Sequence, residues 1–315
     1  MKNDLQHLKV KKPDGDAAVF HGSWYRGRHT RFIPDKAELQ KDGAIRKHIV
    51  RGWEPEPFLT RETPIVSFGS CFARHVQLRL QQDGYRVLGH DRSEISSHII
   101  RFGEGIVNTF SILQQFQWAI EGKSFDHLYW FGPKKEIALP GEEERAETES
   151  LLRQADVFVL TLGVSEIWYD KVTGEAFWRA IPMSIFDEER HGFRVSTVAE
   201  NAANLTETHR IIKSVNPDAK VIVTLSPVPL MATFRPVSCI SASTVSKAVL
   251  RVAIDEVMRA DLDDLYYFPS YEIVKEYFPD PFTDDNRHPK PEIVKAVLDE
   301  FMDVFTVDEG ASSEA

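Results

Sequence analysis

The stretch from Asp156 to Leu162 reads Asp-Val-Phe-Val-Leu-Thr-Leu and is the clearest fold signal in the chain. It is a nearly continuous apolar run, which is typical of a strand buried on both faces of a parallel sheet. A second run of this kind spans Lys220 to Leu225. Shorter runs at 65–68, 85–88 and 265–268 are further strand candidates.

Segments with helical spacing lie between and after these runs, at residues 72–82, 109–121, 142–153, 197–215, 242–259 and 291–305. Strands that alternate with helices predict a parallel sheet layered between helices. We therefore expect a three-layer α/β domain with five strands over residues 63–307. Residues 1–62 read as an irregular arm packed on the domain by its aromatics, and residues 308–315 as a frayed acidic tail.

Composition limits the classes of function. The 315 residues carry a net charge of −10, so the chain repels phosphate backbones and we expect no nucleic-acid partner. Two cysteines provide neither a disulfide framework nor a zinc cluster. The chain shows no apolar signal region near its start and no run of about 18 apolar residues. These features predict a cytoplasmic protein without a membrane span.

The turn at Phe68-Gly69-Ser70-Cys71-Phe72-Ala73 joins a predicted strand to a predicted helix. Such a turn exposes a serine at the sheet edge and directs free backbone N–H groups toward whatever that serine attacks. Gly69 permits the sharp turn. The alternative is that Gly-Ser serves only as a turn and a helix N-cap.

A second candidate lies before the last helix, where Asp285 and His288 are three residues apart. This spacing lets a carboxylate bond an imidazole within one short loop, and an oriented imidazole is the general base that a serine needs. Asp284 is the competing carboxylate. The alternative is an acidic loop with one exposed histidine.

Three further positions could form pocket walls. Gly163, Ser165 and Glu166 close the central strand, where Glu166 is either a pocket carboxylate or a loop charge. Asn108 is an amide that could donate a hydrogen bond to a substrate, or a cap of the helix that follows it. Ser226-Pro227 follows the next strand, and a proline-stiffened loop is its simpler interpretation.

The order of these motifs resembles that of the SGNH (GDSL-type) hydrolases. Gly69 to Ala73 is similar to the motif that names the related GSCFA family. The resemblance spans roughly residues 63–305, and its other motifs are Leu162 to Trp168, Ser226 to Leu230, Ala232 to Phe234, Tyr267 to Glu272 and Asp285 to Pro289. It implies a flavodoxin-like five-stranded sheet of order 2-1-3-4-5 and an ester hydrolase or acyltransferase. It further implies Ser70 as nucleophile, His288 as base and Asp285 as its orienting partner.

The sequence departs from the wider SGNH pattern at the oxyanion hole. Ser165 stands where that pattern has an asparagine, and Glu166 follows it. An ionised carboxylate facing a developing negative charge would oppose catalysis. We therefore expect Glu166 to brace the Ser70 turn, and the Ser70 N–H together with Gly105 N–H or Asn108 to hold the oxyanion.

The predicted function is serine-dependent hydrolysis or transfer of an acyl group on a small or carbohydrate-like ester, without metal or cofactor. The carbohydrate part depends on Trp168, Phe177 and Trp178 as a stacking rim. A non-catalytic binding module is the main alternative, and thiol chemistry at Cys71 a further one. His90, Asp91 and His98 match no strong metal-ligand pattern.

Overall fold

The computed structural model describes residues 7–11, 17–21, 31–89, 107–125, 129–131, 135–137, 141–178 and 180–307. For the short strands in 7–21 and 129–137, and for Phe68 and Cys71, it describes the backbone alone. The chain divides into two units, residues 1–42 and 43–315.

The first unit holds an antiparallel hairpin and a short helix. Strand β1 (His7–Lys11) pairs with β2 (Ala17–His21), and His7 lies opposite His21. Helix α1 (Lys36–Leu39) is capped by Asp35, whose carboxylate accepts from the Glu38 N–H. The predicted tail at 308–315 lies outside the described residues.

The second unit begins at Gly43, twenty residues before the boundary expected from the sequence. Its first element is η2 (Arg46–Val50), and Val50 and Leu59 are fully buried in the core. The N–H groups of Phe58 and Leu59 donate to the Phe305 carbonyl at 2.9 and 2.8 Å. These bonds join the segment to the last helix, and its irregular backbone explains why no periodic pattern revealed them.

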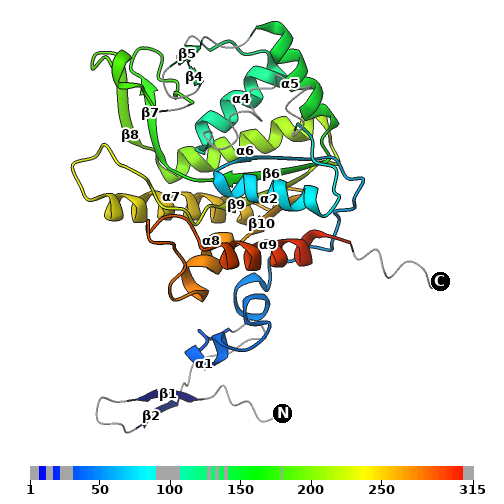
Figure 1. Cartoon of the computed structure of the whole chain (residues 1–315), viewed down its shortest axis with the longest axis vertical. Helices are drawn as coiled ribbons and strands as arrows, with labels where there is room; N and C mark the ends of the chain where they lie inside the picture. The colour runs from blue at the N-terminus through cyan, green and yellow to red at the C-terminus, as the bar shows by residue number, and fades with distance from the viewer. Residues whose placement is uncertain are drawn as a thin grey trace, which may run out of the picture. The chain divides into compact units, whose positions relative to one another are not determined.

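Four parallel strands form the sheet in the order β10-β9-β6-β3 (Figure 1). They are β3 (Ile65–Gly69), β6 (Val157–Leu162), β9 (Lys220–Leu225) and β10 (Leu265–Phe268). The predicted strand at 85–88 makes a single bridge, from Val87 to Ile65. It lies beside β3, where the 2-1-3-4-5 order puts strand 2, but a five-stranded order is not confirmed.

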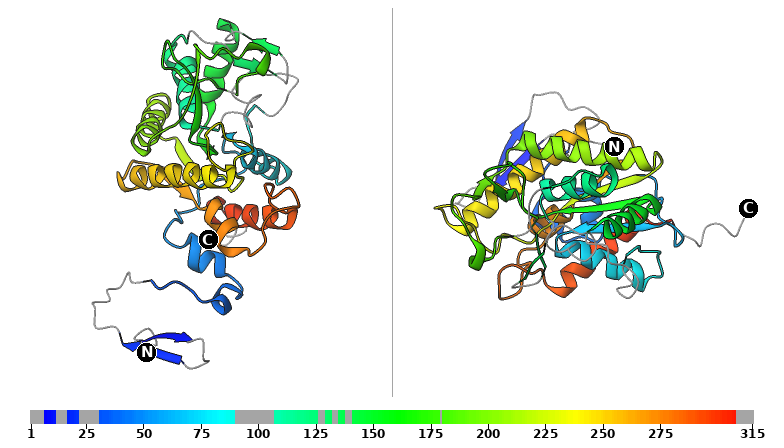
Figure 2. Two further views of the ribbon diagram at one scale, coloured as in Figure 1. Left: turned by 90° about the vertical axis from the view of Figure 1, so that its left-hand side faces the viewer. Right: turned by 90° about the horizontal axis from the view of Figure 1, so that it is seen from above.

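Helices cover both faces of this sheet, as Figures 1 and 2 show. One layer contains α4 (Thr109–Glu121), α5 (Glu142–Gln154), α6 (Val198–Val215) and α7 (Cys239–Arg259). The other contains α2 (Cys71–Gln82), η4 (Ile273–Tyr277) and α9 (Pro291–Phe305), and the short α8 (Ser270–Glu272) precedes η4.

The buried strands serve both layers because their side chains alternate between the faces. On β6, Phe158 and Leu160 pack toward the first layer, whereas Val157 and Val159 pack toward the second. The continuous apolar run in the sequence therefore has the origin that was predicted for it.

A second hairpin stands beside the sheet. Strand β7 (Glu166–Asp170) pairs with β8 (His191–Val195), and η3 (Met183–Ile185) lies in their connection. The chain turns before Gly174 in this connection, and Tyr169 bridges to Ala176. The pair β4 (Tyr129–Phe131) and β5 (Lys135–Ile137) is also antiparallel. Within the described ranges, no helix is both long and apolar enough to cross a bilayer.

Candidate active site

Ser70 stands at the junction of β3 and α2, and Gly69 makes that junction possible. Gly69 has φ +128°, a conformation that residues with a side chain rarely adopt. A Cβ atom at this position would lie 2.1 Å from the Thr161 carbonyl oxygen of the neighbouring strand β6. Glycine is therefore required both by the backbone angle and by the close approach to β6.

The hydrogen bonds of Ser70 show that it caps α2. Its Oγ accepts from the Phe72 N–H at 3.3 Å, and its own N–H donates to Thr161 O at 3.1 Å. The expectation that the Ser70 N–H holds an oxyanion is thus corrected, because β6 already uses that donor. The next N–H, at Cys71, is the first of the helix, where helix geometry provides no intrahelical acceptor.

Asp285 and His288 form a bonded pair within one hairpin. His288 Nδ1 bonds Asp285 Oδ2 closely, and Asp285 Oδ1 accepts from the backbone N–H groups of Arg287 and His288 at 2.9 and 3.0 Å. The Thr283 N–H donates to His288 O at 2.9 Å and closes the hairpin. Asp284, the competing carboxylate, has no such bond to the imidazole in the described part of the chain.

These bonds fix the charge state of the carboxylate. The His288 and Arg287 donors and the Thr283 hydroxyl hold the pKa of Asp285 well below its usual range. The carboxylate therefore stays ionised and accepts from Nδ1–H of the imidazole. Nδ1 is thereby engaged, and no described group bonds Nε2, which is the proton-accepting nitrogen of a neutral imidazole that donates from Nδ1. His288 and Asp285 are about half exposed.

Asn108 lies against the end of β6 and caps α4. Its Oδ1 accepts from the Ser111 N–H at 2.9 Å, which commits the amide oxygen and leaves Nδ2 without an acceptor among the residues described. The carbonyl of the preceding Val107 accepts from the Gly163 N–H at 2.7 Å. A Cβ on Gly163 would lie 2.9 Å from the Val107 Cβ. Because Gly163 has no side chain, the segment that carries Asn108 can pack closely against the end of β6. The other candidate donor, Gly105, lies outside the described residues.

Ser165 is not an oxyanion donor in this structure. It is fully buried, its N–H donates to Ser246 Oγ at 2.8 Å, and its hydroxyl lies 3.3 Å from the same oxygen. Its carbonyl accepts from both donors of Ser196 at 2.8 Å. Ser165 therefore joins β6 to α7 and to the end of β8.

Glu166 is a brace, but for a different segment from the one expected. Thr233 Oγ1 bonds its two carboxylate oxygens at 3.1 and 2.9 Å, and Arg235 Nη1 lies 3.7 Å from Oε1. The carboxylate thus ties β7 to the loop between β9 and α7. Among the described contacts, it has none with the backbone of the Ser70 turn.

The predicted aromatic rim is corrected as well. Phe177 and Trp178 are buried in the core, and Trp178 Nε1 donates to Gln114 at 2.9 Å. Trp168 is half-buried and packs against Phe193 and Phe234. Within the described residues no cluster of side chains could hold a metal ion, and His90, Asp91 and His98 lie outside them.

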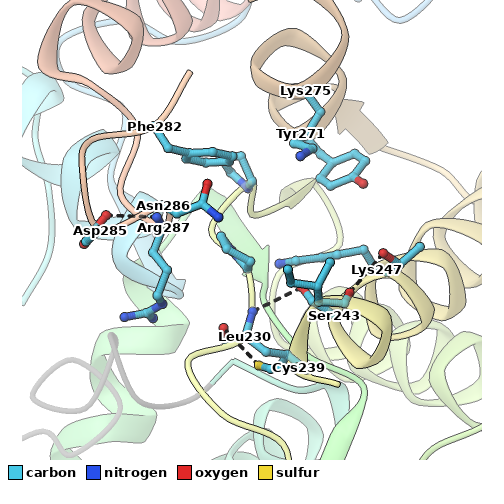
Figure 3. A pocket seen from close by; sticks show the side chains of 14 residues that line it. Leu230, Cys239, Ser243, Lys247, Tyr271, Lys275, Phe282, Asp285, Asn286 and Arg287 are labelled. Atoms are coloured by element: carbon cyan, nitrogen blue, oxygen red, sulfur yellow. Dashed lines mark hydrogen bonds between the residues drawn. The ribbon is translucent and has the colours of Figure 1, made fainter. Parts of the chain in front are cut away.

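Lys247 was missed by sequence reasoning. It lies on α7, is 4% exposed, and its Nζ donates to the carbonyls of Gly163 and Ser226, each at 2.7 Å. These carbonyls follow the ends of β6 and β9. Lys247 also lines a cavity of about 250 Å³ that Asp285 borders (Figure 3). The sequence signal that could have revealed its burial is its helical spacing from Ser243, Leu250 and Ile254, which lie on the buried face of α7.

Comparisons with known proteins give one family match and a distant structural neighbour. A family model described as the GSCFA family matches residues 64–301. No curated protein matches the chain. Among solved structures, an acetyl xylan esterase (Est2A) from the rumen bacterium Butyrivibrio proteoclasticus is 13% identical with a TM-score of 0.36. The match covers 78% of this chain and 64% of that one, so the chain spans less than two thirds of its neighbour.

Proposed function

This chain belongs to the GSCFA family, and from that premise we propose that it is a serine esterase or acyltransferase that acts on small ester substrates. One observation carries the proposal: His288 is held by an ionised Asp285 and keeps Nε2 free. Ser70 begins α2 at the carboxyl end of β3, and in open α/β sheets such strand ends carry the active site.

In the proposed reaction, Ser70 Oγ attacks the ester carbonyl while His288 Nε2 takes its proton. Asp285 holds the imidazole by its Nδ1–H and stabilises the imidazolium that forms. The proton then passes to the leaving alcohol. Water, or an acceptor hydroxyl in a transferase, attacks the acyl-serine, and His288 returns a proton to Ser70.

We propose that the Cys71 N–H and Asn108 Nδ2 donate hydrogen bonds to the oxyanion. The first is the donor after the nucleophile at a helix N-terminus, a common arrangement in acyl transfer. The second is an amide whose oxygen is committed to the Ser111 N–H, so its nitrogen remains available. Both donors are neutral, as a developing negative charge requires.

The test uses a fluorophosphonate probe and p-nitrophenyl acetate on the full chain. We expect labelling at Ser70, and a loss of esterase activity of about 10⁴-fold in Ser70→Ala. The matched control is Ser238→Ala, because Ser238 also caps a helix, α7, by accepting from the Ser241 N–H. It loses the same kind of cap and should keep its activity.

A folded wild-type protein that neither labels nor turns over a panel of short esters would contradict this function. It would favour the non-catalytic binding module, for which the engagement of Ser70 Oγ by the Phe72 N–H is the supporting observation. Labelling by iodoacetamide at Cys71 with loss of esterase activity, retained in Ser70→Ala, would instead indicate thiol chemistry.

A further inference from the structure

The cavity beside the Asp285–His288 hairpin collects positive charge. Figure 3 shows side chains that reach it from the loop after β9, from α7, from α8 and η4, and from the hairpin. We propose that this cavity binds a small organic carboxylate and that Lys247 holds its charge. The assignment goes beyond the proposed ester chemistry and can be tested without any activity.

Lys247 is a buried cation without a bonded anion. Lysine is almost never fully buried unless it is paired, yet Nζ here bonds only the carbonyls of Gly163 and Ser226. No described carboxylate forms an ion pair with it. An ammonium carries three N–H donors, so one remains for a ligand. A carboxylate in the cavity would supply both the missing acceptor and the missing counter-charge.

The rest of the lining adds to the positive charge. Lys275 and Arg287 both border the cavity, and Arg287 Nε is a buried nitrogen with no hydrogen-bond partner in the described structure. Lys275 Nζ lies 5.2 Å from the ring centre of Phe282. Asp285 is the one carboxylate among the described lining residues, and His288 already engages it. The cavity therefore has cations that no lining anion balances.

One part of the remaining wall is apolar and favours a ligand with a carbon body, beside the polar Ser243, Thr244 and Asn286. Pro227, Leu230, Ile240 and Phe282 form this apolar part. The volume of about 250 Å³ lies just below the usual range for small-molecule pockets, which starts at about 300 Å³. A short monocarboxylate fits this combination of one charged head and a few carbons. Inorganic phosphate has no part that the apolar walls would bury.

Protonation of Lys247 should control the affinity. Burial lowers the pKa of this ammonium to about 7, so its charge is lost above neutral pH. The ionisable groups that face it across the cavity or from its own helix are Cys239, Tyr271, Lys275, Asp285 and Arg287. Burial raises the pKa of Tyr271, so its phenol stays neutral here. Carboxylate binding should therefore weaken as the pH rises from 6 to 9.

The experiment titrates the full chain at pH 6 with sodium butyrate, and separately with butyramide, its neutral isostere, by calorimetry or ligand-observed NMR. We expect butyrate to bind at least about tenfold more tightly than butyramide, and Lys247→Met to remove most of that difference. Lys275→Met, at an exposed lining position, should weaken butyrate severalfold. Lys295→Met, an exposed lysine paired with Asp299 on α9, is the matched control and should change nothing.

Three results would overturn the proposal. They are equal affinity for butyrate and butyramide, phosphate binding as tight as butyrate binding, or no butyrate binding at 50 mM. If Lys247→Met does not fold, three other measurements decide. They are the butyrate affinities of Lys275→Met and of Arg287→Gln, and the pH dependence of butyrate affinity in Cys239→Ser, which lacks the lining thiol. Affinity that is independent of pH and of both lining cations would then exclude an anion site.

Discussion

Replacing Gly69 by alanine should be among the most damaging single-methyl changes in this protein. The new Cβ would lie 2.1, 2.8 and 2.9 Å from the carbonyl oxygen, carbonyl carbon and nitrogen of Thr161. All three are backbone atoms of the buried strand β6, so no side chain can rotate away. The strand pairing between β3 and β6 must open locally, and with it the 3.1 Å bond from the Ser70 N–H to Thr161 O.

The cost can be assembled from its parts. A residue with a side chain in the backbone conformation of Gly69 costs about 1–3 kcal/mol in strain. Overpacking against a fixed neighbour costs about 1–3 kcal/mol more, and the lost hydrogen bond about 0.5–1.5 kcal/mol. The expected loss of unfolding free energy is about 2.5–7.5 kcal/mol, which lowers the melting temperature by about 5–30 °C in a domain of this size.

Thermal and guanidinium unfolding of Gly69→Ala measure this loss. Gly174→Ala is the matched control, because Gly174 has φ +79° but a Cβ added there would meet nothing within 4 Å. It should lose only the conformational term, about 1–2 kcal/mol. If the two variants melt within about 2 °C of each other, steric contact with β6 does not determine the turn at Ser70.

Three further outcomes are expected. Asp285→Asn should lower kcat for an ester by about 10³–10⁴-fold through loss of the oriented tautomer, whereas Asp284→Asn should leave kcat within twofold. Equal effects of the two substitutions would exclude Asp285 as the catalytic partner of His288. Glu166→Gln should cost about 1–3 kcal/mol of unfolding free energy because a partly buried cation loses its partner, while the exposed Glu189→Gln changes less than about 0.5 kcal/mol. The unfolding free energy of the wild type relative to Lys247→Met should rise between pH 7 and 10.5, because the pKa of Lys247 is about 7 in the folded protein and higher in the unfolded chain, which therefore binds more protons in this pH range. A free-energy difference that does not change with pH would show that Lys247 keeps an ordinary pKa.

The layers of the fold could be predicted from the sequence because their signals are local. The strands β6 and β9 are apolar runs, and α6 opens with the capping box that Thr197 and Glu200 form in the structure. The strand expected at 85–88 is not confirmed, because pairing depends on a partner strand as well as on an apolar pattern. The structure gives this segment a single bridge, from Val87 to Ile65.

The Asp285–His288 pair could also be predicted, because three residues of spacing bring the two side chains together in one hairpin. The partner of Glu166 could not. Thr233 is 67 residues away, and no local pattern indicates which loop will reach a buried carboxylate. The prediction of an aromatic rim was wrong because the sequence alone does not distinguish aromatic side chains that face a ligand from those, such as Phe177 and Trp178, that are buried in the core.

Gly163 links the buried Lys247 of α7 to the segment that carries Asn108. Its carbonyl accepts from Lys247 Nζ and its N–H donates to Val107 O, so one residue contacts both the lysine that lines the cavity and the segment that carries Asn108. A side chain there would collide with Val107. Glycine is therefore required after β6 because Val107 leaves no room for a side chain. Gly163 lets the segment of Asn108 bond its N–H at the end of β6, while Lys247 of α7 bonds its carbonyl in the next peptide group.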